Sequence, residues 1–334
     1  MAPATDRGST PRVRPSASAA GLTTPGTVTL MISQPSRRYA TLEFDSGRWI
    51  DFPLREGDII ISTPPKTGTT WVQMICALLI FQTPVPPQAL AVMSPWLDYL
   101  ETPQEELYAR LAEQDHRRVI KTHTPLDGLP IDPRAKYIVI GRHPVDRAAS
   151  LYNQLANIDY RRLSEFIDEA HRIGGKRRGR LAEPPPLPPI REWLENWCAP
   201  SHVGDMGSVP DDLVETIHHL HQAWTQRAQP YIWLTHFDDL RNDLSAEMAR
   251  LAAWLDITVE PAVWTTLVKA ATFEEMKSQA ARVAPTHVLK SPEAFFHRGQ
   301  SGTGWDVLSA EGHAAYLARV ERMAPPDFLA WLHR

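Results

Sequence analysis

The fold is decided by residues 57–81, which read GDIIISTPPKTGTTWVQMICALLIF. The apolar run 58–62 is bounded by a glycine and a proline, and it predicts a short strand buried on both faces. Residues 69–81 follow a glycine-containing turn and predict an apolar helix. A strand that turns directly into a helix points backbone N–H groups and the positive end of the helix dipole at one place, where a phosphate group binds well.

The turn at residues 63–71, Thr-Pro-Pro-Lys-Thr-Gly-Thr-Thr-Trp, has the side chains that such a site needs. Gly68 lets the backbone approach a ligand, Thr69 and Thr70 add hydroxyl donors, and Lys66 supplies a positive charge. Taken alone, the stretch could also be an ordinary strand-to-helix turn capped by threonine. A P-loop nucleotide hydrolase is disfavoured, because its lysine directly follows the second glycine, whereas here the lysine precedes the glycine by two positions.

The rest of the chain continues the alternation of strands and helices. Strands are predicted at 119–121, 136–140 and 231–234, and helices at 144–154, 211–229, 245–255 and 308–323. This order predicts a single α/β domain with a central, mostly parallel sheet flanked by helices. Because ligands bind such sheets beyond the carboxyl ends of the strands, the polar residues that follow each strand are the candidates for a site.

Composition excludes several classes of protein. The chain has 334 residues, 43% of them hydrophobic, and a formal charge of only −4, so it lacks the basic excess of a nucleic-acid-binding protein. Its two cysteines have no zinc-site spacing, which favours a reduced, cytoplasmic compartment. No apolar stretch approaches the roughly 20 residues that span a membrane. We therefore expect no membrane span, and any anionic ligand must be held by a local site.

Two segments differ in composition from the predicted domain. Residues 1–38 are rich in Pro, Ser, Thr, Ala and Arg and predict a flexible tail before a domain at 39–334. Residues from about 161 to 210 contain a basic run and a proline cluster, and they predict a lid-like excursion over the surface. The basic run Lys176–Arg180 could attract an anionic substrate or a membrane surface, or it could simply be solvated.

A cluster of three histidines, His218, His219 and His221, lies on a predicted helix. Histidines at such spacing can suggest a metal ion, but no carboxylate or cysteine completes a set of ligands at a suitable distance along the chain. We therefore expect no metal site.

Five segments together resemble the cytosolic-type sulfotransferases that use 3′-phosphoadenosine-5′-phosphosulfate (PAPS). The turn 63–71 is similar to the first signature of that family, Thr-Tyr-Pro-Lys-Ser-Gly-Thr-Thr-Trp. The other four segments are 120–125 (Ile-Lys-Thr-His-Thr-Pro), 136–150 with its Gly-Arg-His-Pro motif, the pair of short segments 237–240 and 272–277, and the glycine-rich segment 295–305. The resemblance extends over about residues 40–334.

The resemblance implies a role for each matching residue. His123 is the catalytic base, since an alcohol is a poor nucleophile until a neutral imidazole takes its proton. Lys66 and Lys121 stabilise the charge on the leaving phosphate. The nucleotide is held by Lys66, Thr67, Gly68, Thr69, Thr70, Trp71, Arg142, Ser150, Phe237, Thr272, Phe273, Arg298 and Gly299, with Arg142, Ser150 and Arg298 on its 3′-phosphate.

In the first signature, Pro64 and Thr67 stand where the family often has tyrosine and serine, and three further departures lie in the later segments. His143 stands where the family usually has asparagine, and His297 where it has arginine. One extra residue separates Gly302 from Trp305 in the glycine-rich segment. These three later departures concern contacts around the 3′-phosphate.

The function implied is in-line transfer of the sulfuryl group of PAPS to an acceptor hydroxyl, with adenosine 3′,5′-bisphosphate as the other product and no metal required. Residues 94–98, 123–129 and 324–327 look especially like actinobacterial relatives, including mycobacterial glycolipid sulfotransferases. A glycolipid hydroxyl is therefore one acceptor, and phenols or other small alcohols are alternatives. A magnesium- and ATP-dependent phosphotransferase and a non-catalytic binding protein are the competing classes. The sequence indicates no oligomeric state.

Overall fold

The computed structural model describes residues 32–41, 43–173, 184–199 and 211–334. Within these ranges four strands form one sheet: β1 (Ile59–Ser62), β2 (Val119–Thr122), β3 (Lys136–Gly141) and β4 (Ile232–His236). The order across the sheet is β2-β1-β3-β4, and every pairing is parallel. The prediction of an α/β fold built on a parallel sheet is confirmed.

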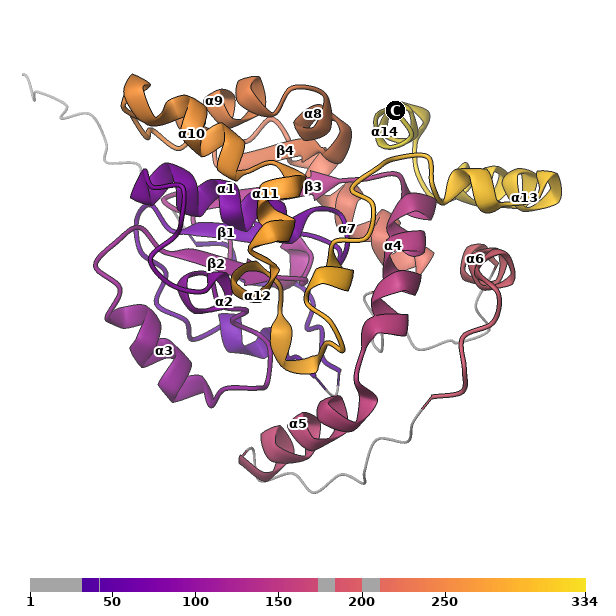
Figure 1. Cartoon of the computed structure of the whole chain (residues 1–334), viewed down its shortest axis with the longest axis horizontal. Coiled ribbons are helices and arrows are strands. Elements are labelled where there is room, and N and C mark those ends of the chain that lie inside the picture. The colour runs from indigo at the N-terminus through magenta and orange to yellow at the C-terminus, as the bar shows by residue number, and fades with distance from the viewer. Residues whose placement is uncertain (1–31, 42, 174–183, 200–210) are drawn as a thin grey trace, which may run out of the picture. The chain divides into compact units, whose positions relative to one another are not determined.

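Helices connect these strands and cover both faces of the sheet (Figure 1). In chain order they are α1 (Thr69–Phe81), α2 (Leu90–Met93), α3 (Gln104–Ala112), α4 (Pro144–Asn157), α5 (Tyr160–Ile173), α6 (Ile190–Cys198), α7 (Leu213–Thr225), α8 (Phe237–Asn242), α9 (Leu244–Trp254), α10 (Pro261–Ala270), α11 (Phe273–Ser278), α12 (Ala280–Val283), α13 (Ala310–Val320) and α14 (Pro326–Leu332). The predicted helix 69–81 has these bounds in the structure, and the other predicted helices and strands lie within a few residues of theirs.

The strands are buried on both faces, as their continuous apolar runs predicted. Alternate residues enter two separate cores, because successive side chains of a strand point to opposite faces. Ile59 and Ile61 pack with α1, α9 and α10 in one core. Ile60 of the same strand packs with α4, α7 and α14 in the other.

All four strands end at the same edge of the sheet. The parallel register pairs Ser62 with Thr122 and Gly141 with His236, which are the last residues of their strands. The residue after β2 is His123, the residue after β3 is Arg142, and the residue after β4 is Phe237. The fold therefore collects the candidate residues along one edge.

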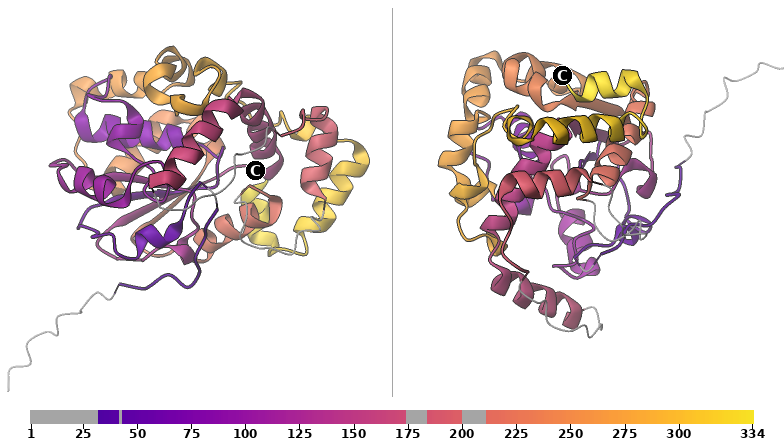
Figure 2. Two further views of the ribbon diagram at one scale, coloured as in Figure 1. Left: turned by 90° about the horizontal axis from the view of Figure 1, so that it is seen from below. Right: turned by 90° about the vertical axis from the view of Figure 1, so that its right-hand side faces the viewer.

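The described part of the predicted excursion 161–210 consists of α5 and α6. Helix α6 lies beside α13 (Figure 2), where Ser309 Oγ donates a hydrogen bond to Glu195 (2.7 Å). Arg191 Nε also donates to the carbonyl of Val307 (2.9 Å). Residues 174–183 and 200–210, including the basic run, lie outside the described residues, and the lid remains a prediction.

The last residues of the predicted tail 1–38 contact the domain. Ser33 exchanges two backbone hydrogen bonds with Ile131, each of 2.9 Å, and the amides of Ser36 and Arg37 donate to the carbonyl of Asp127. Residues 1–31 lie outside the described residues. Among the described helices, none has the length and apolar character needed to cross a bilayer.

Candidate functional site

The turn between β1 and α1 is held by its own side chains. Thr67 Oγ1 donates to the carbonyl of Pro64 (2.9 Å), and the hydroxyls of Thr63 and Thr69 share a hydrogen bond of 2.6 Å. Gly68, with φ of 122°, is the N-cap of α1, and no side chain caps the helix there. The first N–H groups of a helix have no partner within it, so this helix start is available to an anion.

Lys66 lies in the same turn in the left-handed conformation, with φ of 70°. Such a conformation is strained for a residue with a side chain, and it is typical of functional turns. Its ammonium group stands over the Phe295 ring, 4.0 Å from the centroid. Burial lowers the pKa of Lys66 to about 7, and repulsion from Arg142, Lys121 and Arg147 adds to the shift. Four cations therefore share this region, and binding a polyanion there relieves their repulsion.

His123, immediately after β2, is buried and bonded to the turn. Its Nδ1 lies 2.7 Å from the carbonyl oxygen of Thr63. A carbonyl oxygen can only accept, so Nδ1 carries the proton and the lone pair of the neutral ring is on Nε2. Burial lowers the pKa of His123 well below its ordinary value, and Lys121 lowers it further. The ring is thus neutral at physiological pH, as a general base must be.

The Trp96 ring packs against His123 and begins a stack of aromatic side chains, called the aromatic wall below. Its ring meets His123 edge to face, with centroids 4.7 Å apart, and Lys121 Nζ stands 4.4 Å from its centroid. Tyr99 stacks on Trp96 at 4.4 Å and Phe166 of α5 stacks on Tyr99 at 5.3 Å. Burial lowers the pKa of Lys121 to about 8, while Asp98 opposes that shift. The rings of Trp96, Tyr99 and Phe166 thus form a continuous aromatic stack that begins at His123.

Arg142, immediately after β3, joins the turn to the glycine-rich segment near the C-terminus. Its Nη1 donates to the carbonyl of Lys66 (3.1 Å) and its Nη2 to the carbonyl of Gln300 (2.9 Å). The guanidinium stands 4.3 Å from the centroid of Phe237. Nε of Arg142 is buried without a hydrogen-bond partner among the described residues. A buried donor without a partner is costly, and an anionic ligand oxygen would satisfy it.

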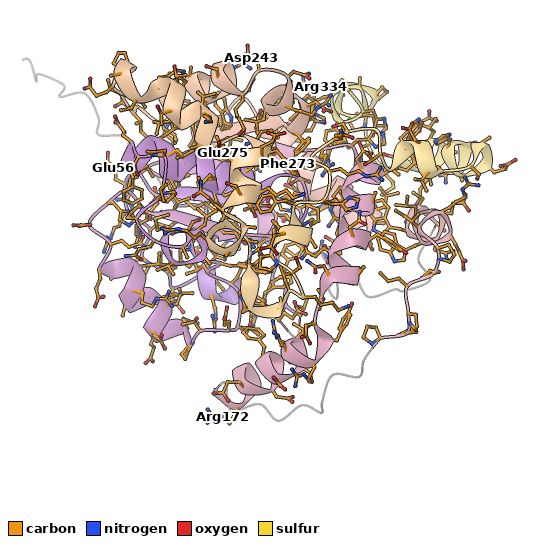
Figure 3. All side chains as sticks on the ribbon, in the orientation of Figure 1. Glu56, Arg172, Asp243, Phe273, Glu275 and Arg334 are labelled. Carbon is orange, nitrogen blue, oxygen red and sulfur yellow. The ribbon has the colours of Figure 1, made fainter. Side chains whose placement is uncertain are left out.

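The residues implied for the adenine side are packed together. Phe237 meets the ring of Trp71 at 5.3 Å, and Trp71 donates its indole N–H to the carbonyl of Ala271 (2.8 Å). Thr272 is the N-cap of α11, and Phe273 is the first residue of that helix. Figure 3 labels Phe273 in the central part of the view, near Glu275 of the same helix.

Gly299 fits against this aromatic group only because it has no side chain. A Cβ at Gly299 would lie 2.5 Å from the Phe273 ring, and its φ is +63°. The glycine-rich segment is therefore packed directly on α11. Two segments that are 26 residues apart in sequence (299 − 273) thereby meet at the site.

The other two residues predicted to bind the 3′-phosphate, Ser150 and Arg298, differ in exposure. Ser150 is half-buried on α4, and Arg298 is exposed, with no ion pair among the described residues. His143 and His297, which differ from the family pattern, both contact other side chains or backbone of the domain. His143 caps α4 by accepting from the amide of Val145 (3.3 Å) and meets the Trp305 ring, while His297 lies 3.4 Å from the amide nitrogen of Asn153.

Sequence reasoning missed two residues of the first turn of α4. Asp146 accepts hydrogen bonds from the amides of Gly302 and Gly304 (2.6 and 2.7 Å) and so holds the glycine-rich segment. Arg147 is fully buried, and its Nε donates to the carbonyl of Pro65 (2.8 Å). Pro65 lies in the turn between β1 and α1, which we call the phosphate-type turn. Nη2 of Arg147 also pairs with Asp211 (2.7 Å). A buried arginine one position after an aspartate has no distinctive sequence signal, because only the tertiary structure shows its partners.

The three neighbouring histidines of α7 have separate partners. His218 contacts Asp127 (2.9 Å), His219 contacts the hydroxyl of Ser62 (3.0 Å), and His221 packs on Phe328. In the part of the chain that the structure describes, no group of three or more metal-ligating side chains is found.

Comparison with known proteins identifies the family. The family model described as the sulfotransferase domain matches residues 56–310. A glycolipid sulfotransferase of Mycobacterium bovis is 38% identical over 316 residues, which cover 88% of this chain and 93% of the relative. This chain belongs to the sulfotransferase family. It is a sulfotransferase, and its prediction as a member of this family is confirmed.

Further relatives agree with this sulfotransferase assignment. A glycolipid sulfotransferase of Mycobacterium tuberculosis is also 38% identical, over 88% of this chain and 93% of its own. Among solved structures, mouse sulfotransferase SULT7A1 complexed with PAP has a TM-score of 0.60 at 19% identity, covering 84% of this chain and 88% of that chain. A retinol dehydratase in complex with androsterone and inactive cofactor PAP has a TM-score of 0.59 at 17% identity, covering 84% and 86%. At such identities the structures show the shared fold.

Replacing Arg147 tests its support of the turn. Arg147→Met leaves the carbonyl of Pro65 and the carboxylate of Asp211 without this partner, so we expect a loss of about 3 kcal/mol in the free energy of unfolding. Arg172→Met removes an exposed pair with Glu169 and should cost no more than about 1 kcal/mol. Urea unfolding measures both, and equal small losses would contradict the structural role given to Arg147.

Proposed function

We propose that this sulfotransferase uses PAPS as donor and transfers its sulfuryl group to an acceptor hydroxyl, with His123 as general base. The observation that carries the proposal is the hydrogen bond between His123 Nδ1 and Thr63. It ties the base to the start of the phosphate-type turn and leaves the lone pair of Nε2 available. A base and a phosphate site joined in this way suit transfer between a phosphate-bearing donor and a hydroxyl.

The residues present fit a doubly phosphorylated adenosine. The uncapped start of α1 and Lys66 would hold the 5′-phosphate, as anions bind at helix N-termini. Arg142 would hold the 3′-phosphate, and its unpaired buried Nε fits that role. Ser150 and Arg298 complete the proposed 3′-phosphate contacts, and Trp71, Phe237, Thr272 and Phe273 the contacts around the adenine. When bound, the donor supplies an electrophilic sulfur and a phosphate leaving group.

His123 acts on the acceptor. Nε2 removes the hydroxyl proton while the acceptor oxygen forms its bond to sulfur and the bond from sulfur to the phosphate oxygen breaks. The low pKa of His123 keeps the ring neutral before this step. The Nδ1–H bond to Thr63 becomes charge-assisted once the ring is protonated, which stabilises the imidazolium.

Lys66 and Lys121 act on the leaving group and on the charge around it. Lys66 donates to the oxygen on which negative charge grows, and Lys121 lies beside the base. Their pKa values of about 7 and about 8 apply to the unliganded protein, and a bound polyanion raises them. The chemistry described uses no metal ion, because the sulfuryl group carries less charge than a phosphoryl group.

The acceptor proposed is a hydroxyl of a glycolipid. The two mycobacterial relatives are named as glycolipid sulfotransferases and match most of this chain. The aromatic wall of Trp96, Tyr99 and Phe166 leads away from His123, and aromatic faces pack well against sugar rings and acyl chains. Tyr152 and Trp193, which meet edge to face at 5.6 Å, lie on α4 and α6 and form a second aromatic contact.

The assignment of the base is tested by His123→Ala. We expect turnover of a glycolipid acceptor with PAPS to fall by about 10²–10⁴-fold, because proton removal is lost. Binding of adenosine 3′,5′-bisphosphate should be retained in a calorimetric titration. His116→Ala is the matched control and should keep full activity, because the His116 ring packs on Phe81 at 4.9 Å. Normal turnover by His123→Ala would show that His123 is not the general base.

The donor assignment is tested by Arg142→Ala. We expect affinity for adenosine 3′,5′-bisphosphate to fall by about 2–5 kcal/mol, because a buried charge partner is lost. Affinity for adenosine 5′-monophosphate should change little. An equal loss for both nucleotides would count against the contact with the 3′-phosphate, and binding of ATP with magnesium in preference to the bisphosphate would indicate a phosphotransferase.

The low pKa values predict proton uptake on nucleotide binding. Lys66 is largely neutral above its pKa of about 7 in the free protein, and a bound polyanion raises that pKa. Affinity for the bisphosphate is therefore full below pH 7 and falls as the pH rises through the pKa of the bound state. Calorimetry at pH 8 in buffers of different ionisation enthalpy should show proton uptake. Lys66→Met should reduce the uptake, and uptake unchanged from the wild type would contradict this assignment.

A further inference from the structure

Asp98 is a buried carboxylate that contacts both neighbours of His123. Its side chain is fully buried, and one oxygen, Oδ2, accepts hydrogen bonds from two hydroxyls, those of Thr122 (2.6 Å) and Thr124 (2.5 Å). These are the residues on either side of His123. The amide of Thr124 donates in turn to the hydroxyl of Thr122 (2.9 Å). One carboxylate oxygen thus accepts hydrogen bonds from both residues that flank His123, and we call this pair of hydrogen bonds the bracket.

The carboxylate is fixed by its own segment. Residues 95–97 run parallel to the end of β2, with the amide of Lys121 donating to Pro95 (2.9 Å) and the amide of Leu97 donating to Lys121 (3.2 Å). The same segment presents the Trp96 ring to both His123 and Lys121. Asp98 therefore lies in the turn that directly follows this bridge of Trp96 with Lys121, next to the end of β2.

Burying the Asp98 carboxylate costs free energy of desolvation. Burial raises the pKa of Asp98, and the two threonine hydroxyls oppose that shift. A buried carboxylate is expensive unless its oxygens are hydrogen-bonded; Oδ2 has the two threonine donors, whereas Oδ1 is buried without a partner among the described residues. An apolar residue at this position would avoid the cost but would leave the Thr122 and Thr124 hydroxyls without an acceptor. The buried carboxylate is thus used to hold the residues that flank the base.

We propose that Asp98 is a positioning residue for the sulfuryl transfer, acting through Thr122 and Thr124 to hold His123 at the angle its proton transfer requires. This inference rests on the proposed role of His123. The Thr63 carbonyl fixes the ring at Nδ1, and the bracket fixes the backbone from which the ring projects. A displacement of about 1 Å at a reacting group can cost about 10²-fold in rate, so the bracket has a measurable effect.

The test compares three variants with a matched control. Asp98→Ala removes the acceptor of both hydroxyls, Asp98→Asn keeps one oxygen that can accept from both, and Thr124→Val removes one arm without touching the carboxylate. Thr235→Val is the control, since Thr235 is a buried threonine of β4 whose hydroxyl lies 3.5 Å from Glu247. The measurements are kcat for PAPS and acceptor, and the affinity and stoichiometry of adenosine 3′,5′-bisphosphate binding.

For Asp98→Ala we expect kcat to fall by about 10²-fold while the bisphosphate binds with its wild-type stoichiometry and within about twofold of its wild-type affinity. Asp98→Asn should recover most of the rate, and Thr124→Val should give an intermediate loss. Thr235→Val should keep the wild-type kcat. A purely structural role would instead lower the binding stoichiometry in parallel with kcat. If the Ala variant does not fold, Thr124→Val decides the question.

Two results would overturn the inference. One is an unchanged kcat in Asp98→Ala or, if that variant does not fold, an unchanged kcat in Thr124→Val. The other is a fall in bisphosphate binding equal to the fall in kcat. His123→Ala in the same assay separates this outcome from failure of the proposed function, because an inactive His123→Ala with a fully active Asp98→Ala rejects only the role of Asp98.

Discussion

The hydrogen bond between His123 Nδ1 and the carbonyl of Thr63 is the contact on which the rest of the site depends. It joins the residues that follow β1 and β2, and it exists because those strands pair in parallel, with Ser62 opposite Thr122. An antiparallel pairing would put the ends of the two strands at opposite edges of the sheet. The parallel register therefore places His123 beside the turn between β1 and α1, and the hydrogen bond sets the tautomer of its ring.

The second constraint is electrostatic. Lys66, Lys121, Arg142 and Arg147 lie close enough together for repulsion to contribute to the low pKa of Lys66. Concentrating cations in a buried region is unfavourable unless acceptors surround them, and backbone carbonyls of residues 65, 66 and 300 accept from the two arginines. A bound polyanion would relieve the repulsion that remains among these cations. His123 stays neutral chiefly because burial lowers its pKa, and the nearby Lys121 lowers that pKa further.

The fold was largely predictable because its strands are short apolar runs that end in glycine, proline or polar residues. The strand 58–62 and the helix 69–81 could be located from periodicity, and their junction indicated an anion site. Other roles could not be assigned in this way. Asp98 and Arg147 look like ordinary charged residues, and their burial and hydrogen bonds arise from segments far away in the sequence. His143 stands where the family usually has asparagine, and only the structure shows that it caps α4 and packs on Trp305.

The amino-acid sequence by itself determined the alternation of strands and helices, the phosphate-type turn and the resemblance that pointed to a sulfotransferase, because these depend on neighbouring residues. The tertiary structure decided which nitrogen of His123 carries the proton, which carboxylate brackets it and how far each lysine is from its ordinary pKa. Those properties depend on burial and on contacts between distant segments, such as Asp98 with Thr124 and Arg142 with Gln300. No local pattern of residues encodes such contacts, since many different sequences can supply the same hydrogen bond.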